Sequence, residues 1–231
     1  MQVVVLCGGK GTRLSEYTES IPKPLIEIGN KPILWHIIQM YKSFGFKDFI
    51  FCLGYKGDKI KEYFNTNNDR GVNIEFKDTG IEASKAERII KVKSLINSEN
   101  FFVTYGDDLS DVNLKKLYDY HKYNKKIVTL TAIKLVSPFG ILEMDNNEVI
   151  GFKEKPNLNH YMNGGFYVFN KKIFDHLKKS EDLESGALTT LAKARQVAAY
   201  KHDGFWKSMN TLKDVMELNE LFNSGEWPWK K

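Results

Sequence analysis

The stretch VVVLCGGKGTRLSEYTESIPKPLIEIGNKPIL, residues 3–34, decides the fold of this chain. It begins with an apolar run of the kind that forms a buried strand, and it continues directly into three glycines, an arginine and a lysine between two prolines. The glycines allow a ligand to approach the backbone closely, and the cations indicate that this ligand is anionic.

The composition describes a folded chain of mixed charge. Of its 231 residues 42% are hydrophobic, which is enough for a sizeable core. The 34 basic and 29 acidic residues give a net charge of +5 and are spread without a long block of one sign. This distribution argues against a basic nucleic-acid-binding tail, while it permits small anionic ligands.

The remaining composition limits the cellular setting and the metal chemistry. No apolar run reaches the roughly 18 to 20 residues that cross a bilayer, and the N-terminus lacks a charged region before an apolar one. We therefore expect a cytoplasmic protein without a membrane or nucleic-acid partner. Cys7 and Cys52 lie in apolar runs and are expected to be buried, reduced thiols, and the five histidines form no metal-binding spacing.

Short runs rich in β-branched and aromatic residues alternate with helical patterns through the first half of the chain. Near-continuous apolar strands alternating with helices predict an α/β fold with a mostly parallel sheet covered on both faces. The expected strands are 2–7, 48–54, 72–76, 101–106 and 127–134, and the expected helices are 32–45, 58–64 and 113–122.

The pattern changes after about residue 135. The segment 139–156 predicts a hairpin that turns at Asn146 and Asn147. No internal repeat or low-complexity linker interrupts the chain. A further strand is expected at 164–170, and helices are expected near 171–179, 184–195 and 211–224.

In an open parallel sheet, ligands bind beyond the carboxyl ends of the strands, and the first expected strand ends at GGKGTRL, residues 8–14. Without side chains at Gly8, Gly9 and Gly11, backbone N–H groups can turn toward a phosphate, and Arg13 adds a planar set of donors. The loop matches neither the G-x-x-x-x-G-K-[ST] nor the G-x-G-x-x-G pattern. We interpret it as a nucleotide-phosphate site, and a tight turn with a surface arginine is the alternative for the loop alone.

Lys23 lies between Pro22 and Pro24, which restrict the backbone on both sides. Such a stretch is often only an extended surface segment. Because it follows Arg13 by ten residues, we expect Lys23 to place a second cation over the same phosphates.

The run FFVTYGDDLSD, residues 101–111, supplies the opposite charge. It ends a buried strand with Asp107 and Asp108 at the sheet edge where the first loop also lies. A Mg²⁺ ion shared between carboxylates and substrate phosphates suits this position. The alternative is an aspartate-rich turn before the next helix, which Asp111 or Asn113 would cap.

Three later positions complete the set. Lys155 follows a strand in FKEKP, Asn163 precedes two glycines in MNGGFYVF, and Asn210 precedes the last expected helix. Taken alone, each of the first two is more typical of a turn than of a site.

These motifs, in this order, resemble the sugar-phosphate nucleotidyltransferases, and most closely their glucose-1-phosphate cytidylyltransferase branch. The resemblance extends from 1 to 231 and depends on the ordered set rather than on any single motif. The matching segments are GGKGTRLSE, PKPLIEIGNKPILWHI, GYKGDKIKEYF, DTG, TYGDD, EKP, NGGFYV, GFWKSMNTLKD and SGEWPWK.

The resemblance implies a Rossmann-like three-layer nucleotidyltransferase fold with a mostly parallel mixed sheet. It also implies a Mg²⁺-dependent reaction in which CMP passes from CTP to a phosphorylated small molecule and pyrophosphate is released. Catalysis would then consist of positioning and charge neutralisation. We expect one domain over 1–231, with a nucleotide-binding half at 1–135 and an acceptor-binding half at 136–231.

The resemblance assigns roles to individual residues. Arg13 would hold the pyrophosphate, Lys23 the α-phosphate and Asp107 the Mg²⁺, which makes these three the expected catalytic residues. Asn210 would be the second metal ligand. The other nucleotide-binding residues would be Leu6, Gly8, Gly9, Gly11, Thr12, Gly80 and Gly106, and the acceptor-binding residues would be Lys155 at the acceptor phosphate with Glu154, Asn163, Gly164, Lys85 and Arg88.

Two features depart from the pattern of the branch. Its members carry an aspartate in an M-D-T motif, whereas this chain has Asn210, which offers a carbonyl oxygen without charge. They also carry a long insertion after K-E-Y-F and a T-G-G-R segment, where this chain has a short polar stretch after Phe64 and the sequence ASKAER, residues 83–88. Lys85 and Arg88 in this segment are expected either to contact a charged acceptor or to be exposed helix residues.

These departures leave two acceptors to compare. One is glucose 1-phosphate, and the other is a non-sugar phosphate such as L-glutamine phosphate, the acceptor of the similar phosphoglutamine cytidylyltransferase type in capsule phosphoramidate synthesis. The choice of CTP rests on resemblance. A non-catalytic nucleotide-sensing protein of the same fold is the alternative from another class, and a homo-oligomer is left open.

Overall fold

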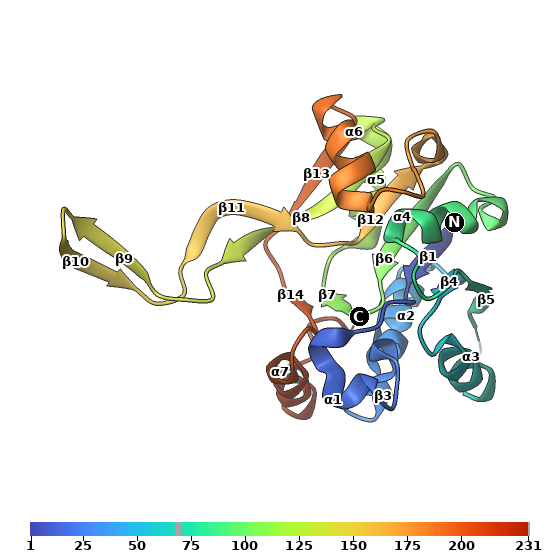
Figure 1. The fold of residues 1–231 in the computed structure, drawn as a ribbon, viewed down its shortest axis with the longest axis horizontal. Coiled ribbons are helices and arrows are strands. Elements are labelled where there is room, and N and C mark those ends of the chain that lie inside the picture. The colour runs from blue at the N-terminus through green and yellow to red at the C-terminus, as the bar shows by residue number, and fades with distance from the viewer. Residues whose placement is uncertain (68–70, 231) are drawn as a thin grey trace.

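A central sheet of eight strands organises the residues that the computed structural model describes, 1–67 and 71–230 (Figure 1). The strand order is β11-β8-β12-β6-β1-β4-β5, with β13 paired to β8. These strands are β1 (Gln2–Leu6), β4 (Asp48–Leu53), β5 (Asn73–Asp78), β6 (Asn100–Tyr105), β8 (Val128–Val136), β11 (Asn157–Asn163), β12 (Tyr167–Asn170) and β13 (Val197–His202).

The sheet is mixed, as expected. β1 runs parallel to both β4 and β6, β4 runs parallel to β5, and β13 runs parallel to β8. β12 is antiparallel to both β6 and β8, and β11 is antiparallel to β8. The five strands expected in the first half of the chain are confirmed within two residues at each end.

Helices cover both faces of this sheet and make the fold a three-layer α/β structure. Alternate side chains of β1 enter different clusters: Val3 and Val5 pack on the side of α2, and Val4 and Leu6 pack on the side of α4. The described helices are α1 (Ser15–Thr18), α2 (Ile33–Ser43), α3 (Gly57–Thr66), α4 (Lys85–Lys91), α5 (Leu114–Asn124), α6 (Thr189–Lys193) and α7 (Leu212–Asn223).

Short elements surround the main sheet. Strand pairs outside it are β2 (Glu27–Ile28) with β3 (Lys31–Pro32), β7 (Asp108–Ser110) with β14 (Trp206–Ser208), and β9 (Ile141–Asp145) with β10 (Glu148–Lys153). The tighter turns are the 3₁₀ helices η1 (Thr12–Leu14), η2 (Lys23–Leu25), η3 (Lys93–Leu95) and η4 (Lys171–Asp175), and the π-helix η5 (Leu183–Leu188).

The second half of the chain differs more from expectation. The hairpin at 139–156 is confirmed, with its turn between β9 and β10. The helix expected at 171–179 is only a 3₁₀ turn, η4, and the one expected at 184–195 is a π-helix followed by the short α6. The sequence patterns did not predict β11, β13 or β14, and a helix at Lys85 and Arg88, where α4 lies, was one of two alternatives.

Two further expectations from the sequence concern the short stretch after Phe64 and the lack of a membrane-spanning segment. The short polar stretch after Phe64 includes residues 68–70, which lie outside the described residues. Among the described helices, none combines the length and the apolar character that crossing a membrane requires.

Candidate functional site

A cleft of about 740 Å³ opens at the carboxyl ends of β1 and β6. Its floor is formed where β1 continues into the glycine loop and where β6 ends at Gly106 and Asp107. This is the edge at which a parallel sheet binds ligands, as the sequence predicted.

The glycine loop is shaped by close backbone contacts. A Cβ atom at Gly8 would lie 2.2 Å from the Arg88 guanidinium and 2.8 Å from the backbone nitrogen of Gly54. Gly11 has φ +64°, in the left-handed region, and a Cβ atom there would lie 2.9 Å from Thr18. Both positions therefore require glycine.

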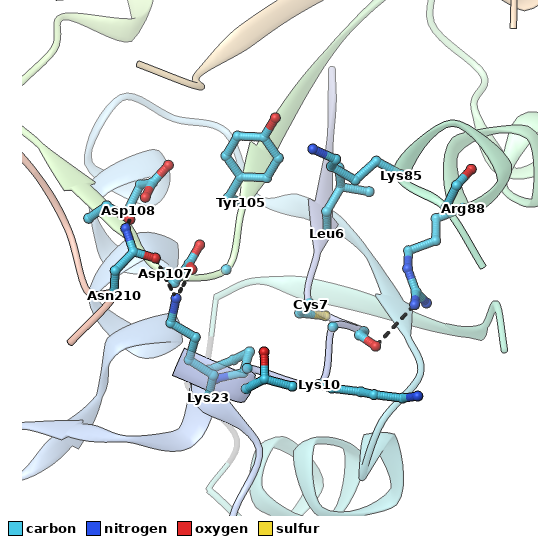
Figure 2. A pocket seen from close by; sticks show the side chains of 18 of the residues that line it. Leu6, Cys7, Lys10, Lys23, Lys85, Arg88, Tyr105, Asp107, Asp108 and Asn210 are labelled. Carbon is cyan, nitrogen blue, oxygen red and sulfur yellow. Dashed lines mark hydrogen bonds and ion pairs between the residues drawn. The ribbon is translucent and has the colours of Figure 1, made fainter. Parts of the chain in front are cut away.

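Lys23 lines the cleft close to the carboxyl end of β6. Its ammonium forms an ion pair with Asp107 Oδ2 and donates a hydrogen bond of 3.0 Å to Asn210 Oδ1 (Figure 2). The side chain is only 8% exposed, and the turn η2 holds its backbone between Pro22 and Pro24. Three residues far apart in the sequence thus converge on one point.

Asp108 has a different environment from its neighbour Asp107. It is 5% exposed, and its strand β7 pairs with β14 so that Asp108 lies opposite Ser208. Burial raises the pKa of the Asp108 carboxyl well above its usual value, and the nearby Asp107 charge adds to this effect. Asp108 is therefore the carboxyl of the two that burial disfavours as a charged group.

The structure corrects the prediction for Arg88, because this residue is neither exposed nor free for an acceptor. Its side chain is 4% exposed and points to the glycine loop (Figure 2). One guanidinium nitrogen donates to the Gly8 carbonyl at 3.0 Å and to the Ile81 carbonyl at 3.1 Å, and the other donates to Leu53, Thr79 and Gly80. Arg88 thus holds the glycine loop in place through its hydrogen bond to the Gly8 carbonyl.

Lys85, one turn before Arg88 on α4, lines the opposite side of the cleft together with two carboxylates. Its ammonium lies 2.6 Å from Glu184 Oε2 and 3.2 Å from Asp182 Oδ2. The Tyr105 hydroxyl donates to Glu184 Oε1 at 2.5 Å. This wall of the cleft therefore carries two negative charges and one positive charge.

A chain of hydrogen bonds extends from this wall to Asn163. The Asn163 amide donates to the Tyr167 hydroxyl at 2.5 Å, and the Tyr167 and Tyr105 hydroxyls lie 2.9 Å apart. The Tyr105 hydroxyl has one hydrogen and donates it to Glu184, so Tyr105 accepts from the Tyr167 hydroxyl. The three hydrogen bonds therefore all run in the same direction, from Asn163 to Glu184. Burial raises the pKa of both tyrosines, so both stay neutral.

The cleft brings most of the predicted site residues together. Those that line it are Leu6, Gly8, Gly9, Gly11, Thr12, Arg13, Lys23, Lys85, Arg88, Gly106, Asp107, Asn163 and Asn210. This placement does not test the individual roles, which remain predictions.

Four predicted residues, all within the described part of the chain, do not line this cleft. Lys155 borders a neighbouring cavity of about 870 Å³, which shares Trp206, Ser208 and Asn210 with the cleft, and Glu154 precedes it. The Gly164 carbonyl accepts a hydrogen bond of 2.8 Å from the Trp206 indole, and the Gly80 carbonyl accepts from Arg88. Lys155 thus lies beside a cavity that adjoins the cleft, and its role at the acceptor phosphate remains a prediction.

Several lining residues escaped the sequence analysis. Lys10, inside the glycine motif itself, forms an ion pair of 2.5 Å with Glu82 across the cleft mouth. Tyr105 lies two residues before the recognised Asp107, so its position was a usable signal. Asp182 and Glu184 begin the π-helix region and carry no motif that would have marked them.

The described residues contain no group of three or more His, Cys, Asp or Glu side chains suited to a metal ion. Protein oxygens that could hold a cation in the cleft come instead from Asp107 and Asn210, which already share the Lys23 ammonium. A Mg²⁺ site of this kind would need substrate phosphates to complete it.

Comparison with known proteins identifies the family. The family model described as nucleotidyl transferase matches residues 2–224. The chain belongs to the nucleotidyl transferase family. This nucleotidyl transferase is 41% identical to a protein of Bacillus subtilis named "Probable glucose-1-phosphate cytidylyltransferase", with 100% of this chain and 99% of the relative covered. It is 40% identical to the glucose-1-phosphate cytidylyltransferase of Salmonella typhi with the same coverage.

Solved structures support the fold of this nucleotidyl transferase. HddC from Yersinia pseudotuberculosis is similar with a TM-score of 0.76 and 24% identity, covering 96% of this chain and 99% of that one. A UDP-glucose pyrophosphorylase solved with UDP-glucose is similar with a TM-score of 0.75 and 19% identity, covering 97% and 98%. The expected Rossmann-like nucleotidyltransferase fold is thereby confirmed.

Proposed function

We propose that this enzyme transfers CMP from CTP to a phosphorylated small molecule and releases pyrophosphate. The observation that carries the proposal is the convergence of Lys23, Asp107 and Asn210 beneath the glycine loop. The names of the full-length relatives support CTP as the donor.

The chain supplies charge and position for this reaction. An oxygen of the acceptor phosphate attacks the α-phosphorus, the bond to the bridging oxygen breaks, and its electron pair leaves with pyrophosphate. Lys23 neutralises charge at the α-phosphate, and Arg13 at the mouth of the loop neutralises the leaving group. A preorganised ammonium in a partly buried cleft needs no reorganisation when charge develops.

The residues present fit a Mg²⁺ ion. Asp107 Oδ2 and Asn210 Oδ1 both contact the Lys23 ammonium, so two oxygen ligands already point to one cation. Asp107 and Asn210 would hold the ion together with substrate phosphates. When bound, it would supply further neutralisation of phosphate charge.

The acceptor side of the cleft favours a charged acceptor. Lys85, Asp182 and Glu184 offer ionic partners of both signs within one wall. L-glutamine phosphate carries an ammonium and a carboxylate besides its phosphate, so both charges would find partners there. A pyranose ring has no charged groups and would leave the one net negative charge of this wall without a partner.

Glucose 1-phosphate is the second candidate, because the full-length relatives are named for it. The neutral hydroxyl of Tyr105 and the amide of Asn163, both of which line the cleft, provide the type of group that binds sugar hydroxyls.

The test is pyrophosphate release from each of CTP, UTP, ATP and GTP with each of glucose 1-phosphate and L-glutamine phosphate, in Mg²⁺. We expect CTP to exceed the other nucleotides at least tenfold in kcat/KM, and L-glutamine phosphate to exceed glucose 1-phosphate. If glucose 1-phosphate gives the higher kcat/KM of the two acceptors, the sugar phosphate is the acceptor. If the protein binds CTP but releases pyrophosphate with none of these combinations of nucleotide and acceptor, the result would instead support a nucleotide-sensing protein.

A further inference from the structure

The side chain of Asn210 is an amide whose two ends differ, so its orientation matters. Its carbonyl oxygen Oδ1 accepts a hydrogen bond of 3.0 Å from the Lys23 ammonium, which also pairs with Asp107 (Figure 2). A reversed amide would turn its NH₂ group toward this ammonium and would offer no oxygen to a cation in the cleft. An ionised aspartate would have no such requirement, because both of its oxygens accept hydrogen bonds.

The backbone around Asn210 is fixed from two sides. The Met209 N–H donates to the Asp107 carbonyl at 2.9 Å, and the Asn210 N–H donates to Asp214 Oδ2 at 3.0 Å. Asp214 also forms the capping box of α7 with Thr211, so the start of this helix and the position of Asn210 are set together. What these contacts leave open is the rotation of the side-chain amide.

Ser208, the last residue of β14, contacts the other end of this amide. Asn210 Nδ2 donates a hydrogen bond of 2.9 Å to Ser208 Oγ. Ser208 is paired with Asp108 across β14 and β7, and directly paired residues point to the same side of a sheet. The two side chains form a hydrogen bond there. Because the single hydroxyl hydrogen of Ser208 is used by the Asp108 carboxyl, Ser208 has only lone pairs to offer to Asn210.

We propose that Ser208 is a positioning residue that keeps the carbonyl end of the Asn210 amide turned toward Lys23 and the cleft. Lys23 favours the same orientation, but its charge serves the α-phosphate in the proposed reaction, whereas the Ser208 contact involves no reacting group. Partners of this kind fix the orientation of groups that hold a metal ion.

The proposal also gives a role to the buried Asp108 carboxyl. As the acceptor for Ser208, it sets the direction in which the serine hydroxyl points. Asp108→Asn would keep an oxygen acceptor for Ser208. The inference rests on the proposed function, because it assigns Asn210 Oδ1 to a Mg²⁺ ion shared with CTP.

The test is the gain in CTP affinity that Mg²⁺ produces, measured by calorimetry on the full chain with Mg²⁺ and with a chelator. We expect Ser208→Ala to reduce this gain about tenfold and to leave the affinity without metal close to that of the wild type. Ser208→Thr keeps the hydroxyl and should retain most of the gain. A merely structural role would instead weaken CTP binding in both conditions. A wild type without any gain from Mg²⁺, or an equal gain in Ser208→Ala, would overturn the proposal.

Asn210→Asp provides a second background for the same measurement. Since a carboxylate needs no orientation, Ser208→Ala should change the Mg²⁺ gain much less in this background than in the wild type. If the loss is equally large in both backgrounds, Ser208 does not act by orienting the amide, and the proposal is wrong. The measurement needs no turnover, so a wild type that binds CTP but releases no pyrophosphate would remove the proposed reaction and still decide the role of Ser208.

Discussion

At the scale of the residue, burial separates neighbours that look alike in the sequence. Asp107 pairs with Lys23 in the cleft, whereas Asp108 is buried opposite Ser208 with a raised pKa. The sequence motif contains both carboxyls, but the local sequence does not show which one is buried. The strand pairing that buries Asp108 involves β14, about a hundred residues away.

His121 provides a pH-dependent prediction. Its imidazole is 2% exposed and lies 2.8 Å from Thr129 Oγ1 and 3.2 Å from Asn100 Oδ1. Burial lowers the pKa of His121 from 6.5 to about 4. The unfolded chain thus binds a proton below pH 6.5 that the folded chain rejects until about pH 4, so the free energy of unfolding falls as pH drops through this window.

We expect the wild type to lose about 2 kcal/mol more than His121→Gln between pH 7 and pH 5. Glutamine keeps a donor and an acceptor but does not titrate. Urea unfolding of both proteins at the two pH values measures the difference. Equal losses would show that His121 does not contribute to the acid sensitivity.

At the scale of the element, the first turn of α4 supports the loop after β1. Ser84 caps α4 by accepting from the Glu87 backbone, and this places Arg88 against the Gly8 carbonyl. The loop that would contact the triphosphate is therefore held by a helix that the sequence analysis gave only as an alternative, with its residues exposed.

Replacing Arg88 with methionine should raise KM for CTP at least tenfold with a smaller change in kcat, because the loop loses its support. Lys91→Met is the matched control, since Lys91 on the same helix donates to the Thr79 carbonyl but not to Gly8. Initial rates over a CTP series, at a temperature where both variants are folded, give the comparison. If KM for CTP is unchanged in Arg88→Met, Arg88 does not support the loop for CTP binding.

The sequence anticipated the elements that follow local patterns and missed those that depend on distant contacts. The apolar strands β1, β4 and β6 and the glycine loop were evident because buried parallel strands have continuous apolar runs. Arg88 was misjudged because a lysine-rich and arginine-rich segment predicts an exposed helix, and only the tertiary fold reveals the carbonyls that bury it. The role of Lys155 at the acceptor phosphate stays a prediction, because Lys155 lines a cavity that adjoins the cleft.

At the scale of the whole molecule, the two expected halves share one sheet. β11, β12 and β13 from the second half join β6 and β8 from the first. The cleft is likewise lined by residues of both halves, because Asp107 comes from the first half and Asn210 from the second. The division into a nucleotide-binding half and an acceptor-binding half remains a prediction about function.

The central claim is that Asp107, beside Lys23, serves the transfer of CMP. The most direct measurement is the rate of pyrophosphate release from CTP, Mg²⁺ and the preferred acceptor by Asp107→Asn and Asp108→Asn. We predict that Asp107→Asn lowers turnover at least a hundredfold, because it removes the charge that faces the cleft. Asp108→Asn should stay within a few-fold of wild type, because the Lys23 ammonium pairs with Asp107, whereas Asp108 is buried opposite Ser208. Wild-type turnover in Asp107→Asn would contradict the account.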